Sequence, residues 1–132
     1  MGLNASLVGR TYPPVAFALE ARRVAAFAAA VGHPGDGVPP TVVTAPELAA
    51  GLANVVADPE LRLDFSRVLH GEQEYQWKRS LSVGESLTAE ATIEEIRSRG
   101  ALEFLTLRTE IRDDEGRVVV VGRSRLIVRG VA

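Results

Sequence analysis

Residues 84–94 alternate strictly between apolar and polar side chains, and this pattern constrains the fold more than any other part of the chain. Alternation over this length is typical of a strand that has one face in a core and one in water. The apolar face carries Leu87, Ala89, Ala91 and Ile93. The chain therefore contains a sheet that some other element must cover on one side.

The sequence predicts that this strand is followed by a long hairpin. Residues 102–112 continue as a strand, 113–116 form an acidic turn that ends in glycine, and 117–129 return. The apolar run Val118–Val121 is typical of a strand that is covered on both faces. Gly122 marks either a bulge or a close approach of another part of the chain.

The first 31 residues predict a short strand and then a helix. Residues 10–19 form an entry turn and the short strand, and Pro13 and Pro14 favour an edge position because they cannot donate ladder hydrogen bonds. Residues 20–31 are rich in alanine and carry apolar side chains at helical spacing. The glycine that follows is a natural stop.

A second helix is predicted from Thr44, or from as early as Pro40, to Asp58. Thr44 and Glu47 have the spacing of a capping box, in which each side chain bonds the backbone of the other. Helical spacing predicts a buried face of Leu48, Leu52, Val55 and Val56. The order of strand, two helices and then antiparallel strands indicates a single α+β domain over residues 1–132.

Composition narrows the classes of function. A chain of 132 residues with 46% hydrophobic side chains fits one globular domain, and a net charge of −2 with pI near 5.7 argues against nucleic acid as a partner. No apolar run approaches the roughly 20 residues that span a bilayer, and no signal peptide is visible, so we expect a cytoplasmic protein without a membrane partner. The absence of cysteine excludes disulfides, thiolate zinc sites and cysteine nucleophiles.

Several segments, in this order and spacing, resemble the MaoC-like dehydratase family, and in particular its N-terminal MaoC-type branch of small actinobacterial 3-hydroxyacyl thioester dehydratase subunits. They are Leu7–Pro14, Phe27–Gly32, Val38–Thr41, Arg67–Gln73 and Ser82–Leu87. The resemblance implies a hot-dog fold, in which an antiparallel sheet wraps around a central helix. It also implies a dimer and acyl-CoA or acyl-carrier-protein substrates in fatty-acid metabolism, and we expect no cofactor.

The chain departs from this family at the catalytic motif. Active members carry an Asp and a His in a G-D-x-N-P-x-H segment just after the first helix, where both reach one substrate carbon–oxygen unit. Here the segment reads Gly32-His33-Pro34-Gly35-Asp36-Gly37-Val38-Pro39-Pro40. His33 stands where the Asp would be, no His follows at the motif spacing, and the segment is short against the family.

The remaining catalytic candidates are His70, His33 and Asp36. His70 is open to three interpretations: a relocated base, a group that positions substrate, or a structural residue of its strand. His33 and Asp36 form either a dyad or an ordinary exposed loop. Together with Glu72 these residues show no ligand spacing, so we expect no metal site.

The run from Val68 to Arg79 supplies the substrate-binding candidates, which are Gly71, Glu72, Gln73, Tyr75 and Trp77. Gly71, Glu72 and Gln73 belong to the segment Arg67–Gln73 that resembles the family. The two rings either line an acyl tunnel or pack in a core or interface. By alternation His70 lies with Val68 and Glu72, opposite Tyr75 and Trp77, unless a bulge at Gly71 turns it to their face.

Three functions remain open on the sequence. The first is a subunit of a (3R)-hydroxyacyl-CoA or acyl-carrier-protein dehydratase (an enoyl hydratase) that borrows its Asp and His from a motif-bearing MaoC-like partner. The second is a homodimeric acyl-thioester binding module without turnover. The third is a dehydratase that uses His70 as a relocated base.

Overall fold

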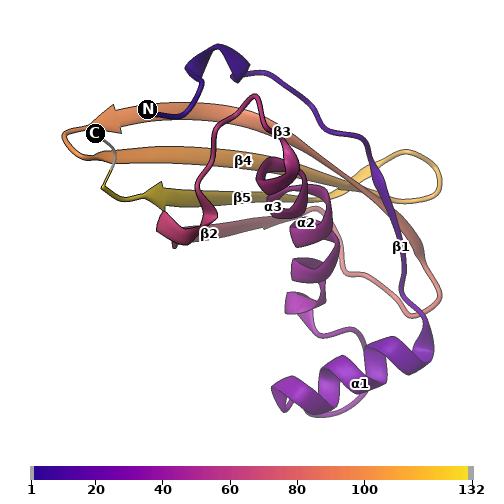
Figure 1. Ribbon diagram of the computed structural model, residues 1–132. Helices are drawn as coiled ribbons and strands as arrows, with labels where there is room; N and C mark the ends of the chain where they lie inside the picture. Colours follow the sequence, from indigo (N-terminus) through magenta and orange to yellow (C-terminus); the bar gives the residue numbers. More distant parts are fainter. Residues whose placement is uncertain (1, 131–132) are drawn as a thin grey trace.

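The computed structural model describes residues 2–130 and shows one five-stranded antiparallel sheet that curves around short central helices (Figure 1). The strand order is β1-β3-β4-β5-β2. The strands are β1 (Val15–Ala18), β2 (Val68–Trp77), β3 (Ser86–Arg99), β4 (Leu102–Arg112) and β5 (Val118–Val128). The expected α+β class and hot-dog architecture are confirmed.

The helices are α1 (Ala21–Val31), α2 (Thr44–Ala50) and α3 (Leu52–Ala57). Figure 1 shows α2 and α3 in the hollow of the sheet, whereas α1 lies at one end of it. Short 3-10 turns cover Ala5–Leu7, Pro40–Val43 and Phe65–Arg67. None of the described helices is long and apolar enough to cross a membrane.

The predicted helix from Thr44 to Asp58 is two helices that meet at Gly51. Gly51 has φ −100° and ψ −81°, which ends α2 and starts α3. A Cβ atom here would lie 3.2 Å from the Glu47 carbonyl oxygen and 3.4 Å from Leu107 Cδ1. The close approach of the sheet therefore accounts for both the glycine and the break. The helical turn begins at Pro40, the earlier of the two predicted starts.

The predicted capping box is wrong. Thr44 already has helical backbone angles, because the Pro40–Val43 turn precedes it, and its hydroxyl donates to the Thr41 carbonyl at 2.8 Å. Glu47 is only 5% exposed and points to the sheet instead of to the helix start. A tertiary contact has replaced the local one.

The predicted buried face of this helix is half right. Val55 is fully buried and Leu52 is partly buried, but Leu48 and Val56 are 53% and 42% exposed. The break at Gly51 separates α2 from α3, so a single helical repeat does not describe both segments. Leu48 instead lies at the rim of a cavity that is described below.

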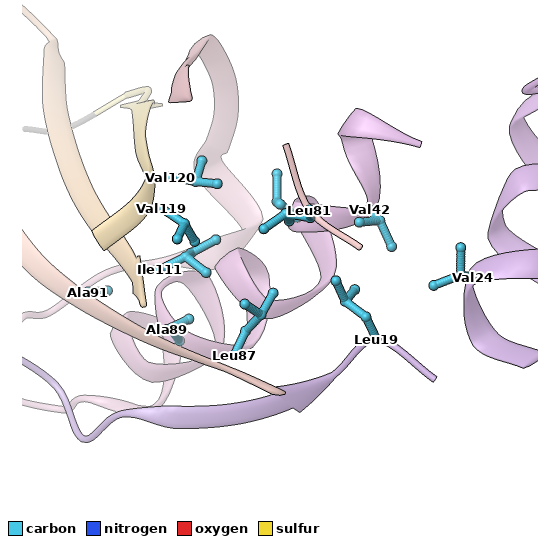
Figure 2. Close-up of a cluster of buried hydrophobic side chains, with 12 residues drawn as sticks. Leu19, Val24, Val42, Leu81, Leu87, Ala89, Ala91, Ile111, Val119 and Val120 are labelled. Atoms are coloured by element: carbon cyan, nitrogen blue, oxygen red, sulfur yellow. The ribbon is translucent and has the colours of Figure 1, made fainter. Parts of the chain in front are cut away.

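Two apolar clusters form the core, one toward each end of the sheet. The first cluster, shown in Figure 2, joins α1 and the Pro40–Val43 turn to β3, β4 and β5. The second packs Val55 against Ile93, Leu105 and Leu126. All four apolar residues of the alternating strand are at most 2% exposed, which confirms the period-2 prediction. Val119, Val120 and Val121 are all buried, as the continuous apolar run predicts.

The turn between β4 and β5 is organised by Asp113. Its carboxylate accepts hydrogen bonds from the backbone N–H groups of Arg117 at 2.9 Å and Glu115 at 3.0 Å, and it pairs with Arg79 at 3.2 Å. These contacts, led by the Arg117 N–H, lower the pKa of Asp113 from 3.8 to about 2. A carboxylate therefore holds the predicted hairpin together.

We expect the free energy of unfolding to fall as the pH drops from about 4 to about 2, since the folded pKa of Asp113 lies below the unfolded one. Its contribution is fully present above the unfolded pKa and is lost as the pH falls through the folded pKa. Urea unfolding across this window measures the slope. Asp113→Asn should flatten it, whereas Asp114→Asn, at the exposed neighbour, should leave it as in the wild type.

Candidate functional site

A mostly apolar cavity of about 430 Å³ opens between the central helices and the strands β2, β4 and β5. Its apolar wall is formed by Leu48, Leu52, Phe65, Val68, Leu107 and Leu126. Its polar groups gather on one side and include Glu47, His70, Gln73, Thr109 and Ser124. An apolar cavity with a few convergent polar groups is typical of a small-molecule site.

Glu47 is the centre of the polar side. The Tyr75 hydroxyl donates to Oε1 at 2.6 Å, and Gln73 Nε2 donates to Oε2 at 2.9 Å. The Ser124 hydroxyl lies 3.2 Å from Oε2. The three partners come from β2 and β5, so this carboxylate ties α2 to two neighbouring strands.

Sequence reasoning missed Glu47, although Gly122 carries a signal of it. Gly122 pairs in regular register with Tyr75 and Thr109, so it is no bulge. A Cβ atom at Gly122 would collide with Oε2 of Glu47 and lie 3.2 Å from Tyr75 Cε1. The other predicted explanation, a close approach, is therefore confirmed.

Burial, assisted by the hydrogen bond to Glu47, raises the pKa of Tyr75 well above its ordinary value. The phenol therefore stays protonated and serves as a donor to Glu47. Its ring lies 6.2 Å from that of Trp77, between centroids, at an interplanar angle of 53°. The two rings share a face of β2, as the sequence predicts.

Trp77 lines a different hollow, of about 250 Å³, together with Val38, Pro40 and Leu81. Among the described residues, neither Tyr75 nor Trp77 belongs to the wall of the larger cavity. Tyr75 reaches that cavity only through Glu47. A tunnel-lining role for the two rings stays a prediction.

His70 lies on the cavity side of β2, the same side as Val68 two residues before it. The β2–β5 register shifts between His70 and Glu72, so β2 has a bulge at Gly71, the exception to regular alternation that the sequence left open, and Gln73 comes to the same side as His70. His70 Nε2 lies 3.0 Å from Oε1 of Gln73, on the same side. Glu72 lies apart from the cavity and pairs with Arg125 at 3.2 Å.

His33 and Asp36 lie in the loop after α1, and neither lines the cavity. Asp36 is exposed and His33 is partly exposed. Within residues 2–130 no side-chain hydrogen bond joins them to each other or to His70. A catalytic role for these two residues stays a prediction. No group of three or more His, Cys, Asp or Glu residues in that range is arranged to hold a metal ion.

Gly122→Ala is expected to destabilise the fold by about 1–3 kcal/mol, the usual cost of an extra methyl group in a packed site. The methyl group collides with Glu47 and crowds Tyr75. A double-mutant cycle with Glu47→Ala, followed by urea unfolding, tests the cause. The cost of Gly122→Ala should shrink when Glu47 is truncated, and an unchanged cost would show that the glycine serves another purpose.

Comparison with known proteins identifies relatives over the whole chain. The family described as "FAS1-like, dehydratase domain region" matches residues 6–121. A UPF0336 protein of Streptomyces coelicolor is 36% identical over 146 aligned positions, which cover 98% of this chain and 97% of that protein. A UPF0336 protein of Saccharopolyspora erythraea is 34% identical, with 100% of this chain and 95% of the relative covered.

The alignment with the Streptomyces coelicolor protein also reveals a length difference. Its 146 positions exceed the 132 residues of this chain, so at least 14 residues of the relative have no counterpart here. This agrees with a chain that is shortened against its family.

Solved structures of known proteins share the fold at low sequence identity. The truncated HadBC complex of Mycobacterium tuberculosis, a (3R)-hydroxyacyl-ACP dehydratase, has a TM-score of 0.70 at 20% identity, with 92% of this chain and 96% of that chain covered. The (R)-hydratase of A. caviae involved in PHA biosynthesis has a TM-score of 0.62 at 23% identity, with 90% and 94% covered. A MaoC-like dehydratase of Rhodospirillum rubrum has a TM-score of 0.57 at 18% identity, with 95% and 94% covered.

Proposed function

This chain belongs to the FAS1-like dehydratase domain family, and from that premise we propose that it is a subunit of a (3R)-hydroxyacyl thioester dehydratase. In this proposal it holds the acyl group of a CoA or carrier-protein thioester. A partner subunit supplies the Asp and His that move the protons. The observation that carries the proposal is an acyl-sized apolar cavity in a domain whose post-helix loop has no catalytic motif.

The cavity suits an acyl chain because its wall is apolar and its polar groups lie on one side. Each methylene group that leaves water contributes about 0.8 kcal/mol. In the proposal the acyl chain lies against Leu52, Leu107 and Leu126, and the thioester end of the ligand faces His70 and Gln73. The bulge at Gly71 supports this arrangement, since it brings Gln73 to the side of β2 on which His70 lies.

The absence of the motif supports a borrowed catalytic pair. A pair that works on one carbon–oxygen unit must lie within hydrogen-bond reach of it. The loop residues His33 and Asp36 lie outside the cavity wall. The UPF0336 relative has at least 14 residues that this chain lacks, and we assign most of them to this loop. A shortened loop leaves room for a long apolar chain.

The free edge of β2 supports assembly with a second subunit. Among the described strands β2 pairs only with β5, and eight of its ten residues are exposed. An open edge of this length invites pairing with another strand. Leu48 and Phe65, at the cavity rim, are 53% and 55% exposed and would be covered by a partner. We therefore place the contact, with a second copy or a MaoC-like partner, along β2.

We expect the purified chain to be at least a dimer at concentrations on the order of 10 μM, the scale of ordinary micromolar interfaces. Joint replacement of Leu48 and Phe65 by Glu should yield a monomer, because two charges would be buried without partners. Sedimentation equilibrium measures both. Val83→Glu is the matched control, since Val83 is 47% exposed but lies in the turn before β3. A wild-type monomer at that concentration would contradict the proposed contact.

The experiment that tests the function is a hydration and dehydration assay with crotonyl and longer enoyl thioesters. The purified chain is assayed alone and after mixing with a MaoC-like subunit that carries G-D-x-N-P-x-H. Turnover that depends on the mixture supports the proposal. Thioester binding without turnover in any mixture would instead favour a homodimeric binding module.

A second candidate, a dehydratase with His70 as its own base, is favoured by one observation. His70 lines the cavity and is hydrogen-bonded to Gln73, which is itself bonded to a buried carboxylate. A carboxylate that acts on a histidine is a common way to prepare a base. This candidate predicts turnover by the lone chain that His70→Ala abolishes.

A further inference from the structure

The polar side of the cavity is a connected chain of hydrogen bonds outside the family motif. It runs from Tyr75 and Ser124 through Glu47 and Gln73 to His70. Glu47 comes from α2, and the other members come from β2 and β5. Glu47 is only 5% exposed and anchors the inner end of the arrangement in the fold, whereas Gln73 and His70 at its outer end are exposed.

The donors and acceptors in this series of hydrogen bonds can be assigned by elimination. Tyr75 and Gln73 both donate to Glu47, which acts as a carboxylate and only accepts. Gln73 must therefore direct its NH₂ group to Glu47 and its Oε1 to His70. An amide oxygen cannot donate, so Nε2 of His70 carries the proton. In the neutral ring Nδ1 then keeps a free lone pair.

The donors of the cluster are used up within it. Gln73 Nε2 also reaches the Glu74 carbonyl at 3.5 Å, and the Ser124 hydroxyl lies 2.7 Å from Gln73 Oε1. What remains for a ligand is acceptors, namely Nδ1 of His70 and the unused lone pairs of Glu47. Thr109 also lines the cavity, outside this cluster, and its hydroxyl can donate or accept.

We propose that Glu47, acting through Gln73, fixes a proton of His70 on Nε2, and that the acceptors left in the cavity select an acyl thioester that carries a hydroxyl group. The hydroxyl donates to Nδ1 of His70 or to Glu47, and an enoyl or saturated acyl group has no donor to offer there. Glu47 is thus a positioning residue. The choice of a 3-hydroxyacyl thioester rests on the function proposed above, whereas the assignment of the histidine proton does not.

The proton assignment is tested by ¹⁵N NMR of the imidazole rings. The chain has two histidines, so His33 in the loop is an internal reference. The wild type should show His70 as the Nε2–H form. In Glu47→Gln the new amide can donate to Oε1 of Gln73. The amide of Gln73 then rotates and directs its NH₂ group to Nε2 of His70. His70 should therefore change to the Nδ1–H form. Gln73→Leu should remove the preference.

Glu74→Gln is the matched control, because Glu74 is the exposed neighbour on β2 and its side chain pairs with Arg123 at 3.5 Å. It should leave both histidines as in the wild type. A His70 spectrum that matches His33 in the wild type would overturn the proton assignment. So would a His70 spectrum that is unchanged in both Glu47→Gln and Gln73→Leu.

Ligand choice is tested by calorimetry with two non-hydrolysable thioethers of equal chain length, one 3-hydroxyacyl and one saturated. The wild type should bind the hydroxyl compound about tenfold more tightly or better, the effect of one hydrogen bond to a charged or polar acceptor. Glu47→Gln should lose this preference, and Glu74→Gln should keep it. Equal affinities in the wild type would overturn hydroxyl selection. Failure to bind either compound would refute the proposed function while leaving the proton assignment intact.

Discussion

The isolated chain is expected to hydrate enoyl thioesters at least about 10²-fold more slowly than the same chain mixed with a motif-bearing partner. A general acid or base usually contributes about 10²–10⁴-fold, and in the proposed function the partner subunit supplies both. The initial rate with crotonyl thioester, measured alone and in the mixture, gives the ratio. Longer enoyl thioesters should show the same dependence, because most of the cavity wall is apolar.

Two controls separate a borrowed pair from one that this chain supplies. In the mixture, replacing the motif His of the partner by Ala should return the rate to that of the lone chain. Robust turnover by the lone chain that His70→Ala abolishes, and that substitutions in the 33–37 loop leave intact, would make His70 the base. That outcome would refute the borrowed pair.

Val55→Ala is expected to lower the free energy of unfolding by about 2 kcal/mol. Two buried methyl groups account for about 0.8 kcal/mol each, and the cavity that they leave adds to this. Val55 is fully buried in the second core cluster, against Ile93, Leu105 and Leu126. Urea unfolding at equal protein concentration measures the difference.

The matched control is the next residue. Val56→Ala removes the same two methyl groups from a side chain that is 42% exposed, and it should change stability by less than about 0.5 kcal/mol. Helical spacing alone predicts similar losses at both positions. Equal losses would therefore favour the continuous amphipathic helix of the sequence pattern over the broken one of the structure.

The parts of the fold that could be predicted are those that depend on near neighbours along the chain. The period-2 pattern of β3 predicts its buried face because successive side chains alternate sides whatever the sheet around them. Asp113 marks its turn because the groups that it binds most directly, at Glu115 and Arg117, are two and four residues away. In both cases the causes lie within a few residues.

Glu47 shows why the candidate site could be predicted only in part. Its spacing from Thr44 is that of a cap, but its partners Gln73, Tyr75 and Ser124 are 26 to 77 residues away. No local pattern contains them. His70 was a candidate from the start, yet its place on the same side of β2 as Gln73 and Tyr75 depends on a bulge against β5.

The position of β5 between β4 and β2 has a consequence for synthesis of the protein. β2 ends at Trp77, but its strand partner begins only at Val118, so the ribosome must add about forty residues, at roughly 5–20 residues per second, before the two can meet. Over those seconds β2 has both edges free, and the cavity lacks Ser124 and Leu126. The cavity wall is thus completed last, and a chain that stops short of β5 leaves β2 without its strand partner.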